Sequence, residues 1–359
     1  MVTHIKKLSV ERKKWLNDGT FKDGVALCQS IPGATAMQTA AYVGLKTRGL
    51  TGALLAYIGF GLPAFILMLV LSAVYLEHRS LPQVASLFTG LQVIVVAIVA
   101  HSAYSFGRGG IKNWHDIFIM AASAGLLLAG VNPFAVIAAS SVFGALFFRK
   151  EAPIPDSISE NGKGKSSMRN AALLTFAFAA ALFILSLFHR GLAHLALTML
   201  KVDLFAFGGG FASVPLMFHE IVTVRGWMDS KTFMDGIALG QVTPGPIVIT
   251  STFAGYLIHG IAGAFVATVA IFTPSFLLVI AITPAMDRLK TSAYFLRATK
   301  GILASFVGLL FFVTVKFALA VPWDIVRVVL VGAAFAALVK KVDILYVVLA
   351  GAAVSLLLF

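Results

Sequence analysis

The sequence predicts an all-α integral membrane protein made of two inverted-topology helical repeats, with broken or re-entrant helices at Pro-Gly motifs. Three observations lead to this fold class. The 359-residue chain is 59% hydrophobic and only 12% charged, with a mean hydropathy of +0.94, so one soluble core could not bury its apolar surface. Several apolar runs exceed the roughly 18–20 residues that a helix needs to cross a bilayer. The third observation is an internal duplication.

The stretch from Trp227 to Pro246 is a second copy of the stretch from Trp15 to Ala34. The two align without a gap at an offset of 212 residues, the difference between Trp227 and Trp15, and the register then slips by one. Repeats of this length in an apolar chain are typical of secondary transporters, whose substrate site lies between the halves. The recurring positions include Phe21, Asp23, Gly24, Gln29, Pro32 and Gly33, matched by Phe233, Asp235, Gly236, Gln241, Pro244 and Gly245.

Apolar runs bounded by charged or turn-forming residues divide the chain into helices. The first domain, residues 1–148, lacks a glycine-rich first segment of its own, and residues 171–359 form the second domain. Residues 149–170, rich in Ser, Gly, Pro and charges of both signs, predict a cytoplasmic linker. In the first domain we expect segments at 23–45 (broken at Pro32-Gly33), 50–76, 84–106, 116–129 and 133–148. In the second we expect 171–189, 202–222, a broken 233–258, 261–283, 294–318, 325–339 and 342–359.

Lysines and arginines in the short loops predict the orientation of the two copies, because cytoplasmic loops carry an excess of both. The loop with Lys46 and Arg48 is basic, whereas its match in the second copy holds only His259. The turns at 77–82 and 129–133 are poor in positive charge, whereas their matches hold Arg288, Lys290, Arg297, Lys300, Lys340 and Lys341. Equivalent loops are therefore expected on opposite sides, with Lys46 cytoplasmic and Phe359 external. Residues 171–258 then cross an odd number of times, as three helices or as one helix and two re-entrant segments.

Each copy carries an Asp-Gly-φ-Ala-Leu-x-Gln-x-x-Pro-Gly motif. Proline removes a backbone donor and clashes with the preceding turn, so the helix breaks there. Such a break is tolerated at membrane depth only where protein or a polar cavity satisfies the freed groups, and the half-helix after it offers free N–H groups to an anion. The alternative is a kink that serves packing alone. The candidate binding residues are Gln29, Pro32 and Gly33, with Gln241, Thr243, Pro244, Gly245 and Pro246.

A second singular element is Phe205–Phe211, FAFGGGF. Its three successive glycines cost roughly 1 kcal/mol each relative to alanine in a helix, which indicates a break or a close backbone approach. The exposed N–H groups of Gly208, Gly209 and Gly210 can form an anion-binding nest. Tight helix packing through small residues is the alternative.

Four ionisable residues are candidates for coupling transport to protons or other ions: Lys201, Asp203, Glu220 and Asp235. Each costs roughly 2.5–3.5 kcal/mol at a helix centre. The competing interpretations are a snorkelling lysine for Lys201, a solvated helix end for Glu220 and an N-cap for Asp235.

Other functional classes are disfavoured. The net charge of +13 is gathered at the ends of apolar runs rather than on one face, so we expect no nucleic-acid partner. Cys28 is the only cysteine, so one chain holds neither a disulfide nor a thiolate metal site. A nucleotide-binding loop and paired catalytic carboxylates are also missing from the sequence, and we expect neither enzyme activity nor a cofactor.

The ordered motifs FGGGF, DG.ALGQ.TPGP and PSF.L resemble the C-terminal half of the chromate ion transporter family, and IPGATAMQTAAYVGLKTRG resembles its N-terminal half. The resemblance covers almost the whole chain. It implies a multi-pass inner (plasma) membrane carrier for chromate or sulfate, with efflux driven by the proton gradient. It points to Phe207, Gly208, Gly209, Gly210, Asp235, Gln241, Thr243, Pro244, Gly245 and Pro246, with Gln29, Pro32 and Gly33 in the first half.

The leading hypothesis is therefore a secondary chromate transporter with a site at the midplane, coupled to protons or to the membrane potential. Uptake or exchange of sulfate or another oxyanion is the runner-up, because these dianions share shape and charge. A non-transporting membrane subunit is the rival of another class, and a membrane-embedded enzyme is a distant third. The expected partners are the oxyanion, the lipid bilayer and, in a homodimer, a second copy of the chain.

Overall fold

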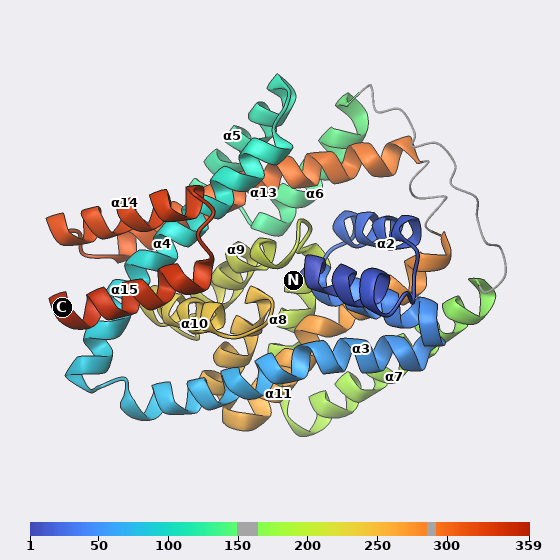
Figure 1. Cartoon of the computed structure of the whole chain (residues 1–359), viewed down its shortest axis with the longest axis horizontal. Helices are drawn as coiled ribbons and strands as arrows, with labels where there is room; N and C mark the ends of the chain where they lie inside the picture. The colour runs from blue at the N-terminus through green and yellow to red at the C-terminus, as the bar shows by residue number, and fades with distance from the viewer. Residues whose placement is uncertain (149–163, 286–291) are drawn as a thin grey trace.

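The computed structural model describes residues 1–148, 164–285 and 292–359. This part of the chain folds into helices without strands (Figure 1). Five of the helices within it are long and apolar enough to cross a membrane, and they lie at Thr35–His78, Pro82–Gly110, Met168–Phe188, Ile247–Ala285 and Ala293–Ala320. The predicted all-α, multi-pass membrane fold is confirmed.

The elements follow one another in two similar series. The first series is α1 (Val2–Lys6), η1 (Lys7–Arg12), α2 (Asp18–Ser30), α3 (Thr35–His78), α4 (Pro82–Gly110), α5 (Trp114–Leu128) and α6 (Pro133–Phe147). After α7 (Gly164–Phe188), the second series is α8 (Arg190–Phe205), η2 (Gly210–Ala212), α9 (Ser213–Phe218), η3 (His219–Val224), α10 (Ser230–Val242), η4 (Ile247–Ile249), α11 (Thr250–Ile282), η5 (Thr283–Ala285), α13 (Ala293–Ala320), α14 (Ile325–Val339) and α15 (Ile344–Leu358).

The α2 helix and the start of α3 form a hairpin whose tip is the Pro32-Gly33 break. The Asn17 side chain caps α2 by accepting from the Thr20 N–H. A Cβ at Gly24 would lie 2.2 Å from the Tyr42 ring, so the two helices are in direct contact. Gly24 and Tyr42 lie nine positions before and after Gly33. The chain therefore reverses at the break instead of continuing across the membrane.

The α3 helix reverses a second time at Arg48 and Gly49. Gly49 has φ 64° and ψ −149°, a conformation that only glycine adopts without strain. Across this turn a Cβ at Gly52 would lie 2.3 Å from the Gly44 carbonyl oxygen, so the arms 35–47 and 50–78 pack backbone to backbone. The first arm completes a re-entrant hairpin, and the second is the crossing arm.

The second copy repeats both reversals. The Asp229 side chain caps α10 through the Thr232 N–H, and a Cβ at Gly236 would lie 2.4 Å from the Phe253 ring. In α11, His259 (φ −140°, ψ 26°) and Gly260 (φ 60°, ψ −149°) follow Arg48 (φ −134°, ψ 21°) and Gly49 closely. The duplication that the sequence predicts is therefore present in the backbone.

A third hairpin contains the glycine-rich segment. The α8 helix ends at Phe205, and the chain returns through α9 and η3, so that Lys201 Nζ lies 2.7 Å from Glu220 Oε1. The expected segment 202–222 is therefore divided at its glycine run. Residues 190–201 are also helical, although we assigned no helix to them. Leu195 and Met199 are buried in this stretch, and α8 packs on α11, a tertiary contact that local hydropathy does not reveal.

The N-terminal segment was likewise not predicted. The six-residue π-helices η1 and η3 occupy equivalent positions in the two copies. Lys22 and Lys6 hydrogen-bond Asp18 and lower the pKa of that carboxyl to about 2. These contacts fasten α1 to the start of α2.

The two copies meet in opposite directions. Tyr57 in α3 donates to the Phe272 carbonyl of α11 at 2.8 Å, and farther along α3 the Phe65 ring packs on Phe265, with centroids 6.4 Å apart. Residue numbers rise along α3 as they fall along α11, so the crossing arms are antiparallel. Each copy also contributes a helical hairpin to the other: α5 and α6 pack on α13, and α14 and α15 pack on α4. This exchange supports the predicted inversion, and the orientation of the copies in the bilayer stays a prediction.

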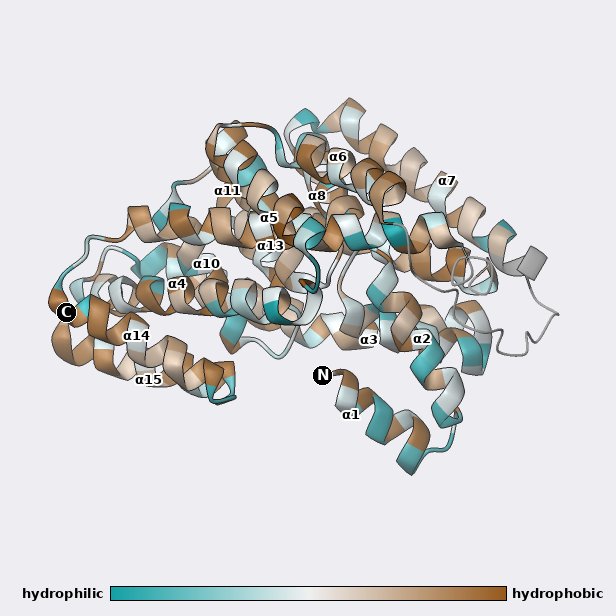
Figure 2. Ribbon diagram, turned by 90° about the horizontal axis from the view of Figure 1, so that it is seen from above, coloured by the Kyte–Doolittle hydropathy of each residue, from teal (hydrophilic) through white to brown (hydrophobic). Residues whose placement is uncertain are grey.

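The peripheral helices α7, α14 and α15 consist largely of apolar residues, as the ribbon colours of Figure 2 show. Phe176 and Phe188 on α7 are 75% and 79% exposed, and Ile325 on α14 is 84% exposed. Such a surface suits lipid. The α7 helix begins at Gly164, within the stretch assigned to the linker, whose residues 149–163 lie outside the described residues, as do the predicted loop cations Arg288 and Lys290.

Candidate functional site

Three hairpin tips meet between the two copies: Pro32–Ala34, Ala206–Gly210 and Thr243–Pro246. We call them the tip cluster. The Gly33 N–H donates to the Ala206 carbonyl at 2.9 Å. A Cβ at Gly209 would lie 3.4 Å from Thr35 Oγ1, and one at Gly210 would lie 3.8 Å from the Ile247 nitrogen. The glycine-rich tip thus lies between the N-terminal ends of α3 and η4.

Glycine is required at this junction by the backbone. Gly33, Gly208 and Gly209 have φ values of 112°, 94° and 92°, which residues with a Cβ rarely adopt. The predicted helix breaks at both Pro-Gly pairs and at the glycine run are confirmed. Interpreting them as uninterrupted helices with packing kinks is wrong, because each break is a chain reversal.

Each Pro-Gly tip packs against the crossing arm of the other copy. A Cβ at Gly33 would lie 1.7 Å from Ser275 Oγ in α11, and one at Gly245 would lie 2.5 Å from the Ala64 Cβ in α3. Both contacts are next to the proline inside the arm, Pro274 or Pro63. The two tips therefore occupy equivalent places along the arms.

Two buried polar side chains, Asp203 and Gln38, adjoin the first tip. Asp203, fully buried at the end of α8, accepts from the Ser275 N–H at 2.8 Å and from its hydroxyl. Gln38 donates to the Pro32 carbonyl. Asp203 Oδ1 and Gln38 Oε1 have no hydrogen-bond partner among the described residues. Sequence reasoning missed Gln38 and Ser275, although the first follows the break by one turn and the second lies in the PSF motif.

The remaining predicted site residues are divided between the tips and their surroundings. Pro32, Thr243 and Pro246 are buried, Gly245 is half-buried and Pro244 is exposed. The Thr243 hydroxyl is engaged with the Gly240 carbonyl of its own helix at 2.9 Å. Gln29 is exposed on α2, whereas Gln241 is half-buried, with its Nε2 lacking a partner in the described structure.

Lys201 and Glu220 lie away from the tip. Glu220 also approaches Arg225, with Oε2 3.7 Å from its Nε, and the Lys201 ammonium lies 3.9 Å from the centre of the Phe134 ring. Both charges are thus engaged with each other, and Lys201 also contacts α6 through Phe134. This pair fastens α8 to η3 rather than facing the tip cluster.

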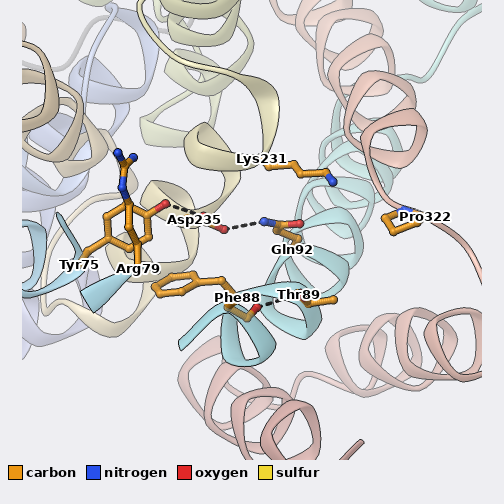
Figure 3. Close-up of a pocket in the computed structure, with 9 residues that line it drawn as sticks. Tyr75, Arg79, Phe88, Thr89, Gln92, Lys231, Asp235 and Pro322 are labelled. Atoms are coloured by element: carbon orange, nitrogen blue, oxygen red, sulfur yellow. Dashed lines mark hydrogen bonds between the residues drawn. The ribbon is translucent and has the colours of Figure 1, made fainter. Parts of the chain in front are cut away.

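Asp235 belongs neither to the tip cluster nor to the Lys201–Glu220 ion pair. The expected N-cap role is wrong, because α10 begins at Ser230 and Asp229 supplies the cap. Asp235 instead accepts from the Tyr75 hydroxyl at 2.8 Å and from Gln92 Nε2 at 2.9 Å. It belongs to a separate pocket, which Figure 3 shows.

Comparison with known proteins gives a consistent result. The family model described as chromate transporter matches residues 1–145 and 193–356. An uncharacterized transporter of Methanocaldococcus jannaschii is 42% identical over 341 residues, which cover 95% of this chain and 85% of that protein. The chromate transport protein of Cupriavidus metallidurans is 31% identical over 303 residues, 83% of this chain and 73% of that protein. An uncharacterized transporter of Bacillus subtilis, 29% identical over 169 residues, matches 45% of this chain with 84% of its own length. No solved structure matches significantly.

Proposed function

The chain belongs to the chromate transporter family, and from that premise we propose that it is a secondary transporter that carries chromate across the plasma membrane through the tip cluster. The observation that carries the proposal is the meeting of three re-entrant tips between the two copies. Non-helical backbone in a membrane protein is stable only inside protein or beside a polar cavity, and in transporters it forms the substrate site.

Backbone N–H groups are the proposed ligands of the oxyanion. Gly208–Gly210 present donors free of side chains, and the N-terminal ends of α3 and η4 add the positive ends of helix dipoles. The three tips contain no lysine or arginine. Such a site attracts a dianion without fixing it to a buried cation, which suits a carrier that must release its substrate.

Alternating access follows from the exchanged architecture. The antiparallel crossing arms form the contact between the copies, and each Pro-Gly tip rests on the arm of the other copy. Rocking of one copy against the other would expose the tip cluster to one side at a time. Chromate carries two charges, so a membrane potential of about 100 mV, negative inside, favours its exit by about 4.6 kcal/mol.

Efflux therefore needs little additional coupling. If protons contribute, Asp203 is the candidate nearest to the tips, since its carboxyl links α8 to Ser275 beside Gly33. Sulfate transport in either direction is the second candidate function, because the donors at the tips recognise shape and charge that chromate and sulfate share.

Flux through liposomes tests the proposal. The protein is reconstituted with an imposed potential, and chromate, sulfate, molybdate and phosphate are compared. We expect chromate flux that Gly209→Val abolishes and that Gly59→Val retains, because a Cβ at Gly59 meets only open space. Thr35→Val, which keeps the backbone intact, should reduce the flux only partly. Normal flux through a correctly inserted Gly209→Val variant would exclude the tip cluster as the site, and no anion flux with the wild type would favour the non-transporting subunit.

A further inference from the structure

A pocket of about 240 Å3 opens beside Asp235, apart from the tip cluster. Figure 3 shows it between the end of α3, the start of α4 and α10. Its lining residues are Tyr75, Arg79, Ala85, Phe88, Thr89, Gln92, Lys231, Asp235 and Pro322. Asp235 precedes Thr243 by eight positions, so the two residues lie about 12 Å apart along the axis of α10.

The floor of this pocket is a carboxyl group held by neutral donors. Asp235 is 5% exposed, and each of its oxygens accepts one hydrogen bond, from the Tyr75 hydroxyl and from the Gln92 amide. No lysine or arginine of the described structure pairs with it. A buried carboxylate without a cationic partner is costly, so this position favours the neutral, protonated form.

The walls carry the opposite charge. Arg79 and Lys231 are exposed and form no ion pair with another described residue. Thr89 contributes a hydroxyl to the same wall, although that hydroxyl donates to the Ala85 carbonyl at 2.8 Å. One more acidic residue, Asp229 at the start of α10, interacts electrostatically with Asp235. Two cationic residues thus line the pocket, and the acidic residue among its lining residues is the buried Asp235.

Two of the residues that line the pocket are not repeated in the other copy. Asp23 matches Asp235, but Gly19 takes the place of Lys231 and Leu303 takes the place of Gln92. The first copy therefore lacks the corresponding wall cation and the amide donor. A feature needed only for the shared scaffold would be expected twice, so the asymmetry indicates a ligand.

We propose that this pocket binds a small inorganic oxyanion between Arg79 and Lys231, and that this binding is linked to proton uptake by Asp235. The two cations attract the anion, whereas an ionised Asp235 would repel it across the same cavity. Protonation removes that repulsion, and by reciprocity a bound anion holds the proton in place. In the topology proposed above, the Arg79 turn is external, so the pocket is an exit-side site, on the outer side of the membrane. That placement, but not the pocket itself, rests on the proposed function.

A cysteine placed in the pocket is protected from a thiol reagent when an anion occupies the pocket. This protection measures the occupancy of the pocket independently of the tip cluster. Thr89→Cys supplies the label site, since the native Cys28 is fully buried. The full-length protein in nanodiscs is treated with a small uncharged thiol reagent at constant ionic strength. The half-protecting concentration of sulfate is then measured from about pH 5 to about pH 8. Sulfate is the probe because it keeps both charges throughout this range, whereas chromate takes up a proton near neutrality.

We expect the half-protecting concentration of sulfate to be about tenfold lower at the acidic end of the pH range. In the Asp235→Asn variant, sulfate should protect the cysteine equally well at both ends of the pH range, because the asparagine side chain stays neutral. Arg79→Gln and Lys231→Gln should each weaken protection several-fold at every pH. Asp23→Asn, the matched position in the first copy, should behave as the parent protein. Absence of protection by sulfate, or an unchanged pH dependence in Asp235→Asn, would overturn the proposal.

Gly209→Val separates this pocket from the transport site. Protection in that variant should equal that of the parent, even if flux is abolished. Protection without any wild-type flux would refute transport and leave the pocket standing, whereas flux without protection would refute the pocket alone.

Discussion

Asp203 shows how one side chain ties three segments together. It lies in the last turn of α8, its carboxyl accepts hydrogen bonds from the N–H and the hydroxyl of Ser275 in α11, and that serine contacts Gly33. Because one oxygen is buried without a partner among the described residues, an ionised carboxylate would be strongly destabilised there. The neutral acid fits the position better.

A pair of substitutions at Asp203 tests this interpretation. Asp203→Asn keeps an acceptor for Ser275, so we expect its free energy of unfolding to lie within about 1 kcal/mol of that of the parent protein. Asp203→Leu leaves both serine donors buried and unsatisfied, and it should cost about 1–3 kcal/mol more. Thermal and denaturant unfolding in detergent measure both. An asparagine variant as unstable as the leucine variant would mean that the negative charge itself is needed.

Gly33 offers a second test at the same scale. A Cβ there would lie 1.7 Å from Ser275 Oγ, at a φ of 112°. We expect Gly33→Ala to lower the free energy of unfolding by about 1–3 kcal/mol. Gly59→Ala lies in a helix with open space around its Cβ, so it should be neutral or stabilising by up to about 1 kcal/mol. Equal stabilities of the two variants would contradict the close approach of tip and arm.

The sequence predicts these special glycines but not their neighbours. Pro-Gly and Gly-Gly-Gly are local signals of broken backbone, which is why the tips were located correctly. Ser275 and Gln92 contact partners far away along the chain. Asp235 was assigned to a cap because it is close to a helix start, but Asp229 occupies that position. Side-chain partnerships between distant segments leave no periodic trace in one sequence.

At the scale of elements, the turns at Gly49 and Gly260 are equivalent. Both have φ near 60° and ψ of −149°, and a Cβ at either position would meet no neighbouring atom. Backbone strain is thus the only cost of a side chain. We expect Gly49→Ala and Gly260→Ala to destabilise by similar amounts, about 1–3 kcal/mol each.

Unfolding measurements on both variants, with Gly109→Ala as the control in open space, test that equality. A loss confined to one of the two turns would show that they are not equivalent in energy. Long apolar runs predicted most of the elements, but their hydropathy does not separate a crossing helix from a re-entrant one. For that reason hydropathy alone predicts neither the start of α8 nor the direction in which the chain continues after its glycine run.

At the scale of the whole molecule, the inverted orientation is open to a direct experiment. Thr51 and Ala262 are exposed equivalent positions just after the two turns, and neither needs a special backbone conformation. Thr51→Cys and Ala262→Cys, each with Cys28→Ala, should react with an impermeant thiol reagent from opposite sides. The labelling of each variant is measured in sealed right-side-out and inside-out vesicles. Labelling of both from one side would disprove the inversion.

The exchange of helical hairpins was beyond sequence reasoning. The duplication itself is visible in the residues. That α5 and α6 pack on α13 while α14 and α15 pack on α4 depends on how the copies are placed in space. A single sequence carries no signal of that placement, because each contact surface is simply apolar.

This exchange means that neither half is a self-sufficient folding unit. Cutting the chain between residues 149 and 163 should leave two fragments, each lacking the partner that covers one of its long helices, α4 or α13. Expressed alone, each fragment is expected to be degraded or to aggregate. Expressed together, the two should reassemble and co-purify through one affinity tag. The linker would then be dispensable, and the two halves would behave as interlocking subunits of a dimer that happens to be encoded in one chain.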